Sequence, residues 1–246
     1  MNCTRWGSAC VTGAQTIAAA QTFWRLPIPH QLTCQVCGGS DRKQFIAWNR
    51  MELFQCQDCG LVWLDPLPDP AGVQAMYDDA YDGATSSYFG KVAQKLKRSR
   101  GRVRYIAGLL PGGAGGKTFL DVGANGGFMA EAARQAGFTA TGIEPDPVSV
   151  AYARMNYPAI TMLHGLLEDS AIAPQGFDVA YCSEVIEHTT DCNRFVAKLA
   201  SVLRPSGLLY LTTPDISHWR RPKQVELWDG FCPPSHCVYG GDKVGH

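Results

Sequence analysis

The sequence predicts an α/β fold, a parallel sheet connected by helices, with a small cysteine-rich module on its N-terminal side. The first observation is an alternation, between residues 118 and 214, of short apolar runs with stretches rich in helix-forming residues. That alternation is typical of a parallel sheet whose strands are joined by crossover helices. The second observation is a pair of Cys-x-x-Cys motifs between residues 34 and 59. Together they predict one larger domain and one small module.

The overall composition of the chain indicates which kinds of binding partner to expect. A chain of 246 residues with 46% hydrophobic and 18% charged residues has the composition of an ordinary soluble protein. Its formal net charge is zero, so it has no overall electrostatic attraction to nucleic acid or to an anionic membrane. No apolar run approaches the roughly 18 to 20 residues that span a bilayer. We therefore expect neither a nucleic-acid nor a membrane partner, and the sequence leaves the oligomeric state open.

Residues 1–32 show no clear helical or strand period, so we predict a poorly ordered extension. A signal peptide is the alternative, but polar residues interrupt the early apolar run and Arg5 is its only nearby charge. The six cysteines outside the Cys-x-x-Cys motifs show no disulfide framework, which favours a reducing, cytoplasmic location. These six are Cys3, Cys10, Cys182, Cys192, Cys232 and Cys237.

Residues 33–66 are predicted to form a zinc ribbon. The first cysteine pair, Cys34 and Cys37, precedes the second pair, Cys56 and Cys59, by 18 intervening residues. Four thiolates at this spacing close a tetrahedron around Zn²⁺ and leave no open position, so we expect a structural zinc site. A glycine follows each pair and lets backbone amides turn back toward the sulfurs. Four cysteines unrelated to a metal are the alternative.

Residues 67–116 connect the ribbon to the larger domain. A proline-rich stretch is followed by spaced aromatic residues, which either line an acceptor pocket or pack the module against the domain. The segment 91–110 predicts an amphipathic helix with a strongly basic face. That face either meets a phosphorylated or nucleotide-linked substrate or is simply solvated. The aromatic residues are Tyr77, Tyr81, Tyr88 and Phe89.

The segment 118–146 predicts a nucleoside-binding βαβ unit. An apolar run ends in a glycine-rich turn, a helix from Phe128 to Ala136 follows, and Thr139 begins a second strand. Glu144 stands at the end of that strand, 23 positions after Asp121. A carboxylate at this place accepts hydrogen bonds from two ribose hydroxyls.

A carboxylate close to the glycine-rich turn helps to decide which nucleoside-containing cofactor the unit binds. Gly123 and Gly127 are present, but Asn125 takes the middle position of the dinucleotide fingerprint. Asp121 precedes the turn, and a fixed carboxylate there repels a pyrophosphate and attracts a sulfonium or ammonium group. S-adenosylmethionine therefore fits better than NAD. A dinucleotide oxidoreductase and a tight turn without a ligand are the alternatives.

Four motifs in order give the chain a resemblance to a known family. The stretch from Thr118 to Pro214 resembles class I S-adenosylmethionine-dependent methyltransferases with a Rossmann-like sheet. The cysteine ribbon resembles the leader of a subfamily whose members often modify sugars or other small metabolites. The motifs are Asp121-Val-Gly-Ala-Asn-Gly-Gly127, Ile143-Glu-Pro-Asp146, Phe177-Asp-Val-Ala-Tyr-Cys-Ser-Glu-Val-Ile-Glu-His188 and Leu203-Arg-Pro-Ser-Gly-Leu-Leu-Tyr-Leu-Thr-Thr-Pro214.

The resemblance implies a cofactor site and a strand order. Residues 117–214 would bind S-adenosylmethionine on a parallel sheet ordered 3-2-1-4-5, with Leu167 and Glu168 at the adenine. The acceptor would be a small molecule such as a sugar or sugar nucleotide. The implied cofactor residues are Asp121, Gly123, Asn125, Gly127, Glu144, Leu167, Glu168 and Ser183.

The C-terminal segment 215–246 departs from the family pattern. The family adds two more strands after the fifth, and this segment shows neither their length nor their alternation, so we predict an irregular tail and a truncated chain. The exposed edge of the fifth strand would favour aggregation. An interaction module that binds the cofactor, or only zinc, without turnover is therefore the alternative function.

Two histidines are candidates for the chemistry of a methyltransferase. A hydroxyl acceptor must lose its proton, and an imidazole can take a proton near neutral pH. His188, close to the end of the fourth predicted strand, is the first candidate and His236 the second. A capping or core histidine is the structural alternative for His188. A divalent metal held by Glu184, Glu187 and His188 is a further alternative.

Overall fold

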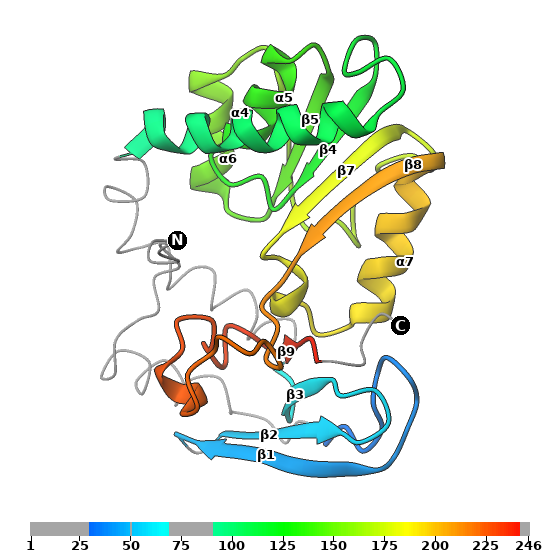
Figure 1. Cartoon of the computed structure of the whole chain (residues 1–246). Coiled ribbons are helices and arrows are strands. Elements are labelled where there is room, and N and C mark those ends of the chain that lie inside the picture. The colour runs from blue at the N-terminus through cyan, green and yellow to red at the C-terminus, as the bar shows by residue number, and fades with distance from the viewer. Residues whose placement is uncertain (1–29, 50, 69–90, 242–246) are drawn as a thin grey trace. The chain divides into compact units, whose positions relative to one another are not determined.

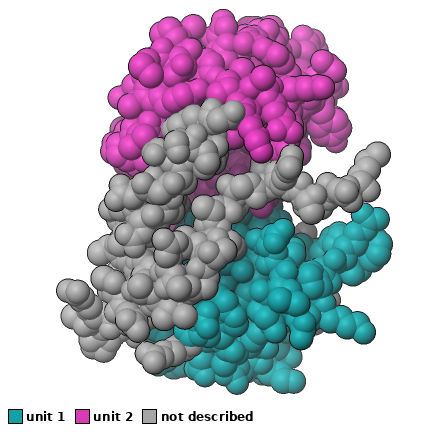
Figure 2. Space-filling model, turned by 90° about the vertical axis from the view of Figure 1, so that its left-hand side faces the viewer, with its two compact units in different colours: residues 1–88, 187–191, 213–246 teal, residues 89–186, 192–212 magenta. Residues whose placement is uncertain are grey.

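The computed structural model of the chain describes residues 30–49, 51–68 and 91–241. These residues belong to two compact units, coloured separately in Figure 2. Unit 1 contains the described parts of 1–88 and 213–246 together with 187–191, and unit 2 contains those of 89–186 with 192–212. Most of the predicted N-terminal extension and the four aromatic residues from Tyr77 to Phe89 lie outside the described residues.

Unit 2 contains the predicted parallel sheet (Figure 1). Its strands lie side by side in the order β6-β5-β4-β7-β8, and every neighbouring pair is parallel. In chain order this is 3-2-1-4-5, so the predicted strand order is confirmed. The strands are β4 (Thr118–Val122), β5 (Thr139–Glu144), β6 (Thr161–His164), β7 (Phe177–Ser183) and β8 (Leu203–Thr212).

Helices cover both faces of this sheet. One apolar cluster joins the sheet to α4, α5 and α6, and a second joins its other face to α7. Burial on both faces explains why the central strands β4 and β7 are largely apolar rather than strictly alternating. The helices are α4 (Val92–Leu109), α5 (Phe128–Gln135), α6 (Pro147–Asn156) and α7 (Cys192–Val202).

Two basic side chains of helix α4 contact other residues of unit 2. Val103 and Ile106 are buried in the core. On the basic face, Arg102 donates to the Tyr181 hydroxyl at 2.6 Å, and the ammonium of Lys95 lies 5.1 Å from the centre of the Phe128 ring. These two cations therefore bind side chains of the unit itself. Whether the remaining basic residues meet a substrate stays a prediction.

Unit 1 contains a second, antiparallel sheet. Its order is β1-β2-β3-β9, and β1 and β2 form the predicted hairpin. Partly exposed Arg42 forms an ion pair with buried Asp65 at 2.5 Å, and Asp65 also accepts the amide of Gln31 at 2.8 Å. The strands are β1 (Arg42–Trp48), β2 (Met51–Cys56), β3 (Val62–Asp65) and β9 (Val238–Tyr239).

Most described residues of the C-terminal segment 215–246 are irregular, but a short part of it joins the ribbon sheet. The short strand β9 pairs with β3, so the end of the chain extends the ribbon sheet. The core of unit 1 mixes ribbon residues with C-terminal ones, and a short 3₁₀ helix, η3 (Val225–Leu227), contributes to it. Its buried members are Met51, Leu53, Val62, Leu64, Ile216, Val225, Phe231 and Tyr239. Burying these apolar side chains together gives the short ribbon a core of its own.

In the described part of the chain, β8 is an edge strand, because no strand there pairs with its outer side. None of the helices in the described residues has the length and apolar character that a membrane crossing requires.

Candidate functional site

The glycine turn between β4 and α5 is held by unusual backbone angles. Gly123 and Gly127 have φ values of 71° and 77°, in the left-handed region that glycine adopts without strain. Asn125 has a φ of 48°, which asparagine tolerates better than most residues. A Cβ at Gly123 would lie 2.5 Å from a methyl group of Val185. The turn therefore needs glycine at Gly123 for both its angle and its packing.

Glu144 is bound directly to this turn. One of its carboxylate oxygens, Oε2, accepts the amide of Asn125 at 2.8 Å, and Oε1 accepts the amide of Asp146 at 3.0 Å. Asp146 in turn caps helix α6 by accepting the amide of Ser149 at 2.8 Å. The carboxylate of Glu144 is therefore fixed at the carboxyl end of β5, where parallel sheets place their ligands.

Asp121 lies under the same turn and is almost completely buried. Its Oδ2 accepts the amide of Ala130, in the first turn of α5, at 3.2 Å. Burial raises the pKa of Asp121 to about 8, the hydrogen bond from Ala130 opposes this, and repulsion from Glu144 adds to it. Burial likewise raises the pKa of Glu144 to about 7. A cation or a hydrogen-bond donor that binds beside either carboxyl would lower its pKa and favour the ionised form.

The other predicted cofactor residues lie at the same edge of the sheet. Ser183 ends β7, and its hydroxyl is hydrogen-bonded to that of Thr212 at 2.7 Å. Leu167 follows β6, but its side chain is buried in the core beside α7, so only its backbone is available to a ligand. Glu168, next to it, is partly exposed. Glu184 has a φ of 58° directly after β7, a strained angle that the sequence did not indicate.

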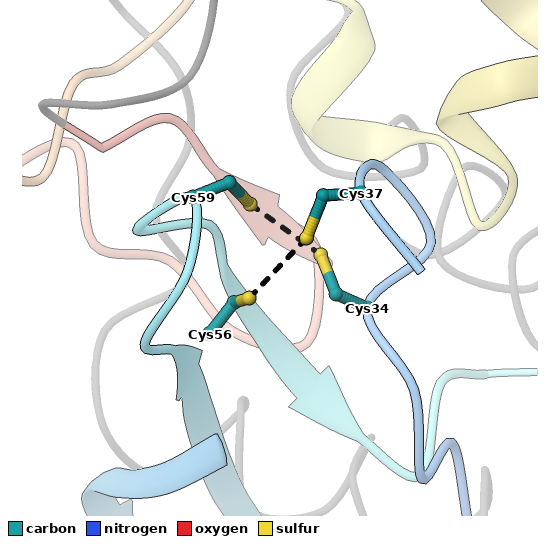
Figure 3. Close-up of side chains that lie close together, drawn as sticks. All are labelled: Cys34, Cys37, Cys56 and Cys59. Carbon is teal, nitrogen blue, oxygen red and sulfur yellow. Dashed lines mark hydrogen bonds between the residues drawn. The ribbon is translucent and has the colours of Figure 1, made fainter. Parts of the chain in front are cut away.

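The four predicted zinc ligands lie together in unit 1 (Figure 3). The Sγ atoms of Cys34 and Cys59 are 3.5 Å apart, as are those of Cys37 and Cys56, and all four sulfurs lie within 4.8 Å of one another. None of the four forms a disulfide. Zn–S bonds of about 2.3 Å in a tetrahedron require sulfurs roughly 3.8 Å apart. The four residues, which we call the cysteine cluster, therefore fit a zinc ion.

The backbone around the cysteine cluster has the geometry that the glycines predict. Gly38 and Gly60, which follow the two pairs, have φ values of 74° and 80°. A hydrogen bond from the Gly39 amide lowers the pKa of the Cys37 thiol. Burial raises the pKa of Cys34 and of Cys59, so these thiols need a positive charge nearby to become thiolates.

A second group of candidate ligands in unit 1 contains both predicted catalytic histidines. One donor atom each from Glu187, His188 and His236 lies within 4.8 Å of the others, and we call these three residues the histidine cluster. The two imidazole rings meet edge to face, with centroids 4.8 Å apart. Glu184, which the sequence offered as a ligand beside His188, is not a member of this cluster. The structural partner of His188 is instead His236.

Both histidines of the cluster are held as neutral rings. Loss of solvation lowers the pKa of His188, although its hydrogen bond to the Ser235 carbonyl opposes this. Burial lowers the pKa of His236 to about 3, and repulsion from His188 adds to the effect. Glu187 and Thr213 were not predicted as partners: the Thr213 hydroxyl donates to Oε2 of Glu187 at 3.0 Å. No local pattern links two residues so far apart in the chain.

The strand order and the glycine turn define the class of protein, a Rossmann-like domain with the class I methyltransferase sheet. A family model described as a methyltransferase domain matches residues 91–243. The match extends over more than half of the chain, and the chain belongs to this family.

Relatives of known name are similar to part of the chain. The ubiquinone biosynthesis O-methyltransferase of Actinobacillus pleuropneumoniae is 36% identical over 107 residues, 40% of this chain and 46% of that protein. The protein of the same name from Histophilus somni is 31% identical over 151 residues, 52% of this chain and 63% of that protein. The chain thus spans less than two thirds of either relative. A solved S-adenosylmethionine dependent methyltransferase from Mesorhizobium loti is 24% identical, with a TM-score of 0.41, over 46% of this chain and 52% of that one.

Proposed function

We propose that this chain is an S-adenosylmethionine-dependent methyltransferase that acts on an oxygen or carbon of a sugar or other small metabolite. The observation that carries the proposal is the position of Glu144, whose carboxylate accepts the amide of Asn125 in the glycine turn. A ribose diol donates hydrogen bonds to such a carboxylate. Since Asn125 belongs to the turn, a nucleoside held by Glu144 would lie beside that turn.

Asp121 favours this cofactor over a dinucleotide. The start of a helix attracts a phosphate through its unpaired amides. Here Oδ2 of Asp121 already accepts the Ala130 amide, which is then not available to a phosphate. Once ionised, the carboxyl of Asp121 would also repel a second anion. A ligand with a sulfonium and an ammonium group meets no such penalty. In addition, both carboxyls become easier to ionise when a cation approaches Asp121.

When bound, S-adenosylmethionine supplies an activated methyl group. The remaining tasks of the protein are to hold an acceptor in line at roughly 3 to 3.5 Å and, for a hydroxyl, to remove its proton. We propose His188 as the proton acceptor and His236 as the second candidate. Each donates its Nδ1 hydrogen to a backbone carbonyl, so Nε2 carries the lone pair that takes a proton. The relatives named O-methyltransferases favour an oxygen acceptor over a carbon.

We propose in addition that the cysteine cluster holds one structural Zn²⁺. Its four sulfurs leave no position for a substrate, so the ion would stabilise the fold of unit 1 and take no part in methyl transfer. The left-handed glycines after each pair support the proposal, because they direct amides to the sulfurs and disperse their charge.

The test is a turnover assay that measures S-adenosylhomocysteine with a panel of hydroxyl-bearing metabolites, including nucleotide-linked sugars. The variant Glu144→Gln should weaken the binding of S-adenosylmethionine by roughly 1 to 3 kcal/mol, the cost of impairing a charged hydrogen-bond partner. The matched control is Glu226→Gln, which removes an exposed carboxylate and should change nothing. Binding without turnover on any acceptor would favour the alternative, a cofactor-binding interaction module. Equal binding by both variants would contradict the cofactor site.

A further inference from the structure

The histidine cluster has the composition and the surroundings of a metal site that is separate from the cysteine cluster. Glu187, His188 and His236 each offer one donor atom, and these atoms lie within 4.8 Å of one another. Two imidazole nitrogens and one carboxylate oxygen are ligands that zinc and neighbouring divalent transition ions accept. The cysteine cluster, by contrast, offers four sulfurs.

The hydrogen bonds of the two rings determine which nitrogen of each ring is available to bind a metal. The Nδ1 of His188 lies 2.7 Å from the carbonyl oxygen of Ser235, and that of His236 lies 2.9 Å from the carbonyl oxygen of Gly230. A carbonyl only accepts, so each Nδ1 carries the hydrogen and each Nε2 carries the lone pair. Metal-binding histidines characteristically donate their other ring hydrogen to a carbonyl or carboxylate in this way.

The carboxylate is oriented by a partner as well. Glu187 is fully buried, and its Oε2 accepts the Thr213 hydroxyl at 3.0 Å. A carboxylate in such a place is costly unless a positive charge or several hydrogen bonds compensate it. A divalent cation between Glu187 and the two imidazoles would add such a charge.

Backbone hydrogen bonds join the two chain segments that contribute the histidine cluster, residues 187–188 and residue 236. The amide of Cys237 donates to the carbonyl of Glu187 at 2.7 Å, and the carbonyl of Cys237 accepts the amide of Leu64 in β3 at 2.9 Å. Both segments are therefore tied to the ribbon sheet independently of any ligand. Such prior ordering lowers the cost of binding an ion.

We infer that Glu187, His188 and His236 bind a divalent transition-metal ion, with zinc as the first candidate, through one carboxylate oxygen and the two Nε2 atoms. Three protein ligands leave a fourth position for a water or hydroxyl oxygen, the arrangement of catalytic rather than structural zinc. The inference goes beyond the proposed function and concerns its acceptor chemistry: a ring that holds a metal through Nε2 does not also take a proton there. A bound ion would lower the pKa of a hydroxyl at that fourth position, so that the hydroxyl could release its proton to water.

Metal counting tests the inference without any assay of methyl transfer. The full chain, dialysed against excess Zn²⁺ and then against buffer, should retain two equivalents of zinc. His188→Gln and His236→Gln should each retain one, because the cysteine cluster of the same unit stays loaded. That retained ion also shows that unit 1 of the variant is folded. The control His218→Gln, an exposed histidine of unit 1, should retain two.

Cobalt substitution identifies which site is lost. Co²⁺ bound to thiolates gives intense sulfur-to-metal charge-transfer absorption, whereas Co²⁺ on nitrogen and oxygen ligands gives only weak bands. His236→Gln should keep the intense absorption and lose the weak bands, and Thr213→Val should lower the Co²⁺ affinity of the weak-band site about 10- to 100-fold. One equivalent in the parent chain, or equal loss from His218→Gln, would overturn the inference and leave His188 as the proposed direct proton acceptor.

Discussion

The glycine turn of unit 2 comes from one continuous stretch of chain, whereas the histidine cluster of unit 1 joins residues 187–188 to residue 236. In the turn, Asp121 and Glu144 are brought together by a single βαβ unit whose geometry is set locally. In the histidine cluster, two distant segments meet in a unit whose small sheet pairs an N-terminal strand, β3, with a C-terminal strand, β9. Unit 2 should therefore keep its binding site when unit 1 is disrupted, whereas the histidine cluster should be lost when unit 1 unfolds, because its two segments meet only in the folded unit.

The largest expected effect is the loss of the cysteine cluster's metal. Cys37→Ser should remove the zinc ion and most of the order of unit 1, because metal binding supplies roughly 10 to 16 kcal/mol in modules of this type. Binding of S-adenosylmethionine to unit 2 should fall far less. Hydrogen exchange of β1 to β3, measured beside a cofactor titration, checks both statements. Chelation of the parent should reproduce the result and added zinc should reverse it; equal loss of order in both units would contradict the comparison.

A smaller effect is expected from the C-terminal part of unit 1. The Phe231 ring is buried and stacks on Tyr239 with centroids 5.6 Å apart. Phe231→Ala should therefore destabilise unit 1 by roughly 3 to 5 kcal/mol. Leu227→Ala, at a side chain that is 66% exposed, should change the stability by less than about 0.5 kcal/mol.

Hydrogen exchange of β3 in these two variants is the measurement. Faster exchange in Phe231→Ala alone would show that the stability of β3 depends on residues far along the chain, unlike that of the strands of unit 2. Unchanged exchange in both variants would mean that the ribbon is stable without its C-terminal partner.

The smallest effect concerns the pH dependence of unit 2. Because the folded-state pKa of Asp121 is raised to about 8 from an ordinary value near 3.8, the folded chain holds a proton that the unfolded chain releases. Its contribution to stability is full below the unfolded pKa and is lost as the pH rises through about 8. Asp121→Asn should therefore stabilise unit 2 above pH 8 by roughly 1 kcal/mol or more, and not at pH 4.

Denaturation of the parent and of Asp121→Asn at pH 4 and pH 8.5 measures this difference. The same variant should bind S-adenosylmethionine more weakly, because it has lost the negative charge that faces the cation. A variant that is no more stable at high pH would show that Asp121 is ionised in the free protein.

Sequence patterns predicted unit 2 well because each of its elements has a local signal. The apolar run before Gly123, the helix-forming stretch from Phe128 and the β-branched run from Thr139 each span enough residues to show a period. Parallel pairing with right-handed crossovers then leaves few arrangements of the strands. The ligand roles of Asp121 and Glu144 stay predictions, although the structure joins both to the turn.

The sequence could not predict the assembly of unit 1 for the opposite reason. Strand β9 has two residues, too few for any periodicity, and its partner β3 lies at the other end of the described chain. Phe231 has no local feature that identifies it as core. The pairing of His188 with His236 is likewise a long-range contact. Leu167 shows a further limit, because a leucine near a predicted adenine site and a leucine of the core have the same local pattern.

Calorimetric titration of the full chain with S-adenosylmethionine and, separately, with NAD shows directly which of the two ligands the glycine turn binds. We expect one binding site for S-adenosylmethionine and no comparable heat from NAD. We also expect S-adenosylmethionine binding at pH 7 to release protons, because Asp121 and Glu144, with pKa values of about 8 and about 7, must ionise to receive the ligand. Proton release appears as a dependence of the heat on the ionisation enthalpy of the buffer. Tighter binding of NAD, or the absence of any binding of S-adenosylmethionine, would contradict the assignment of this turn.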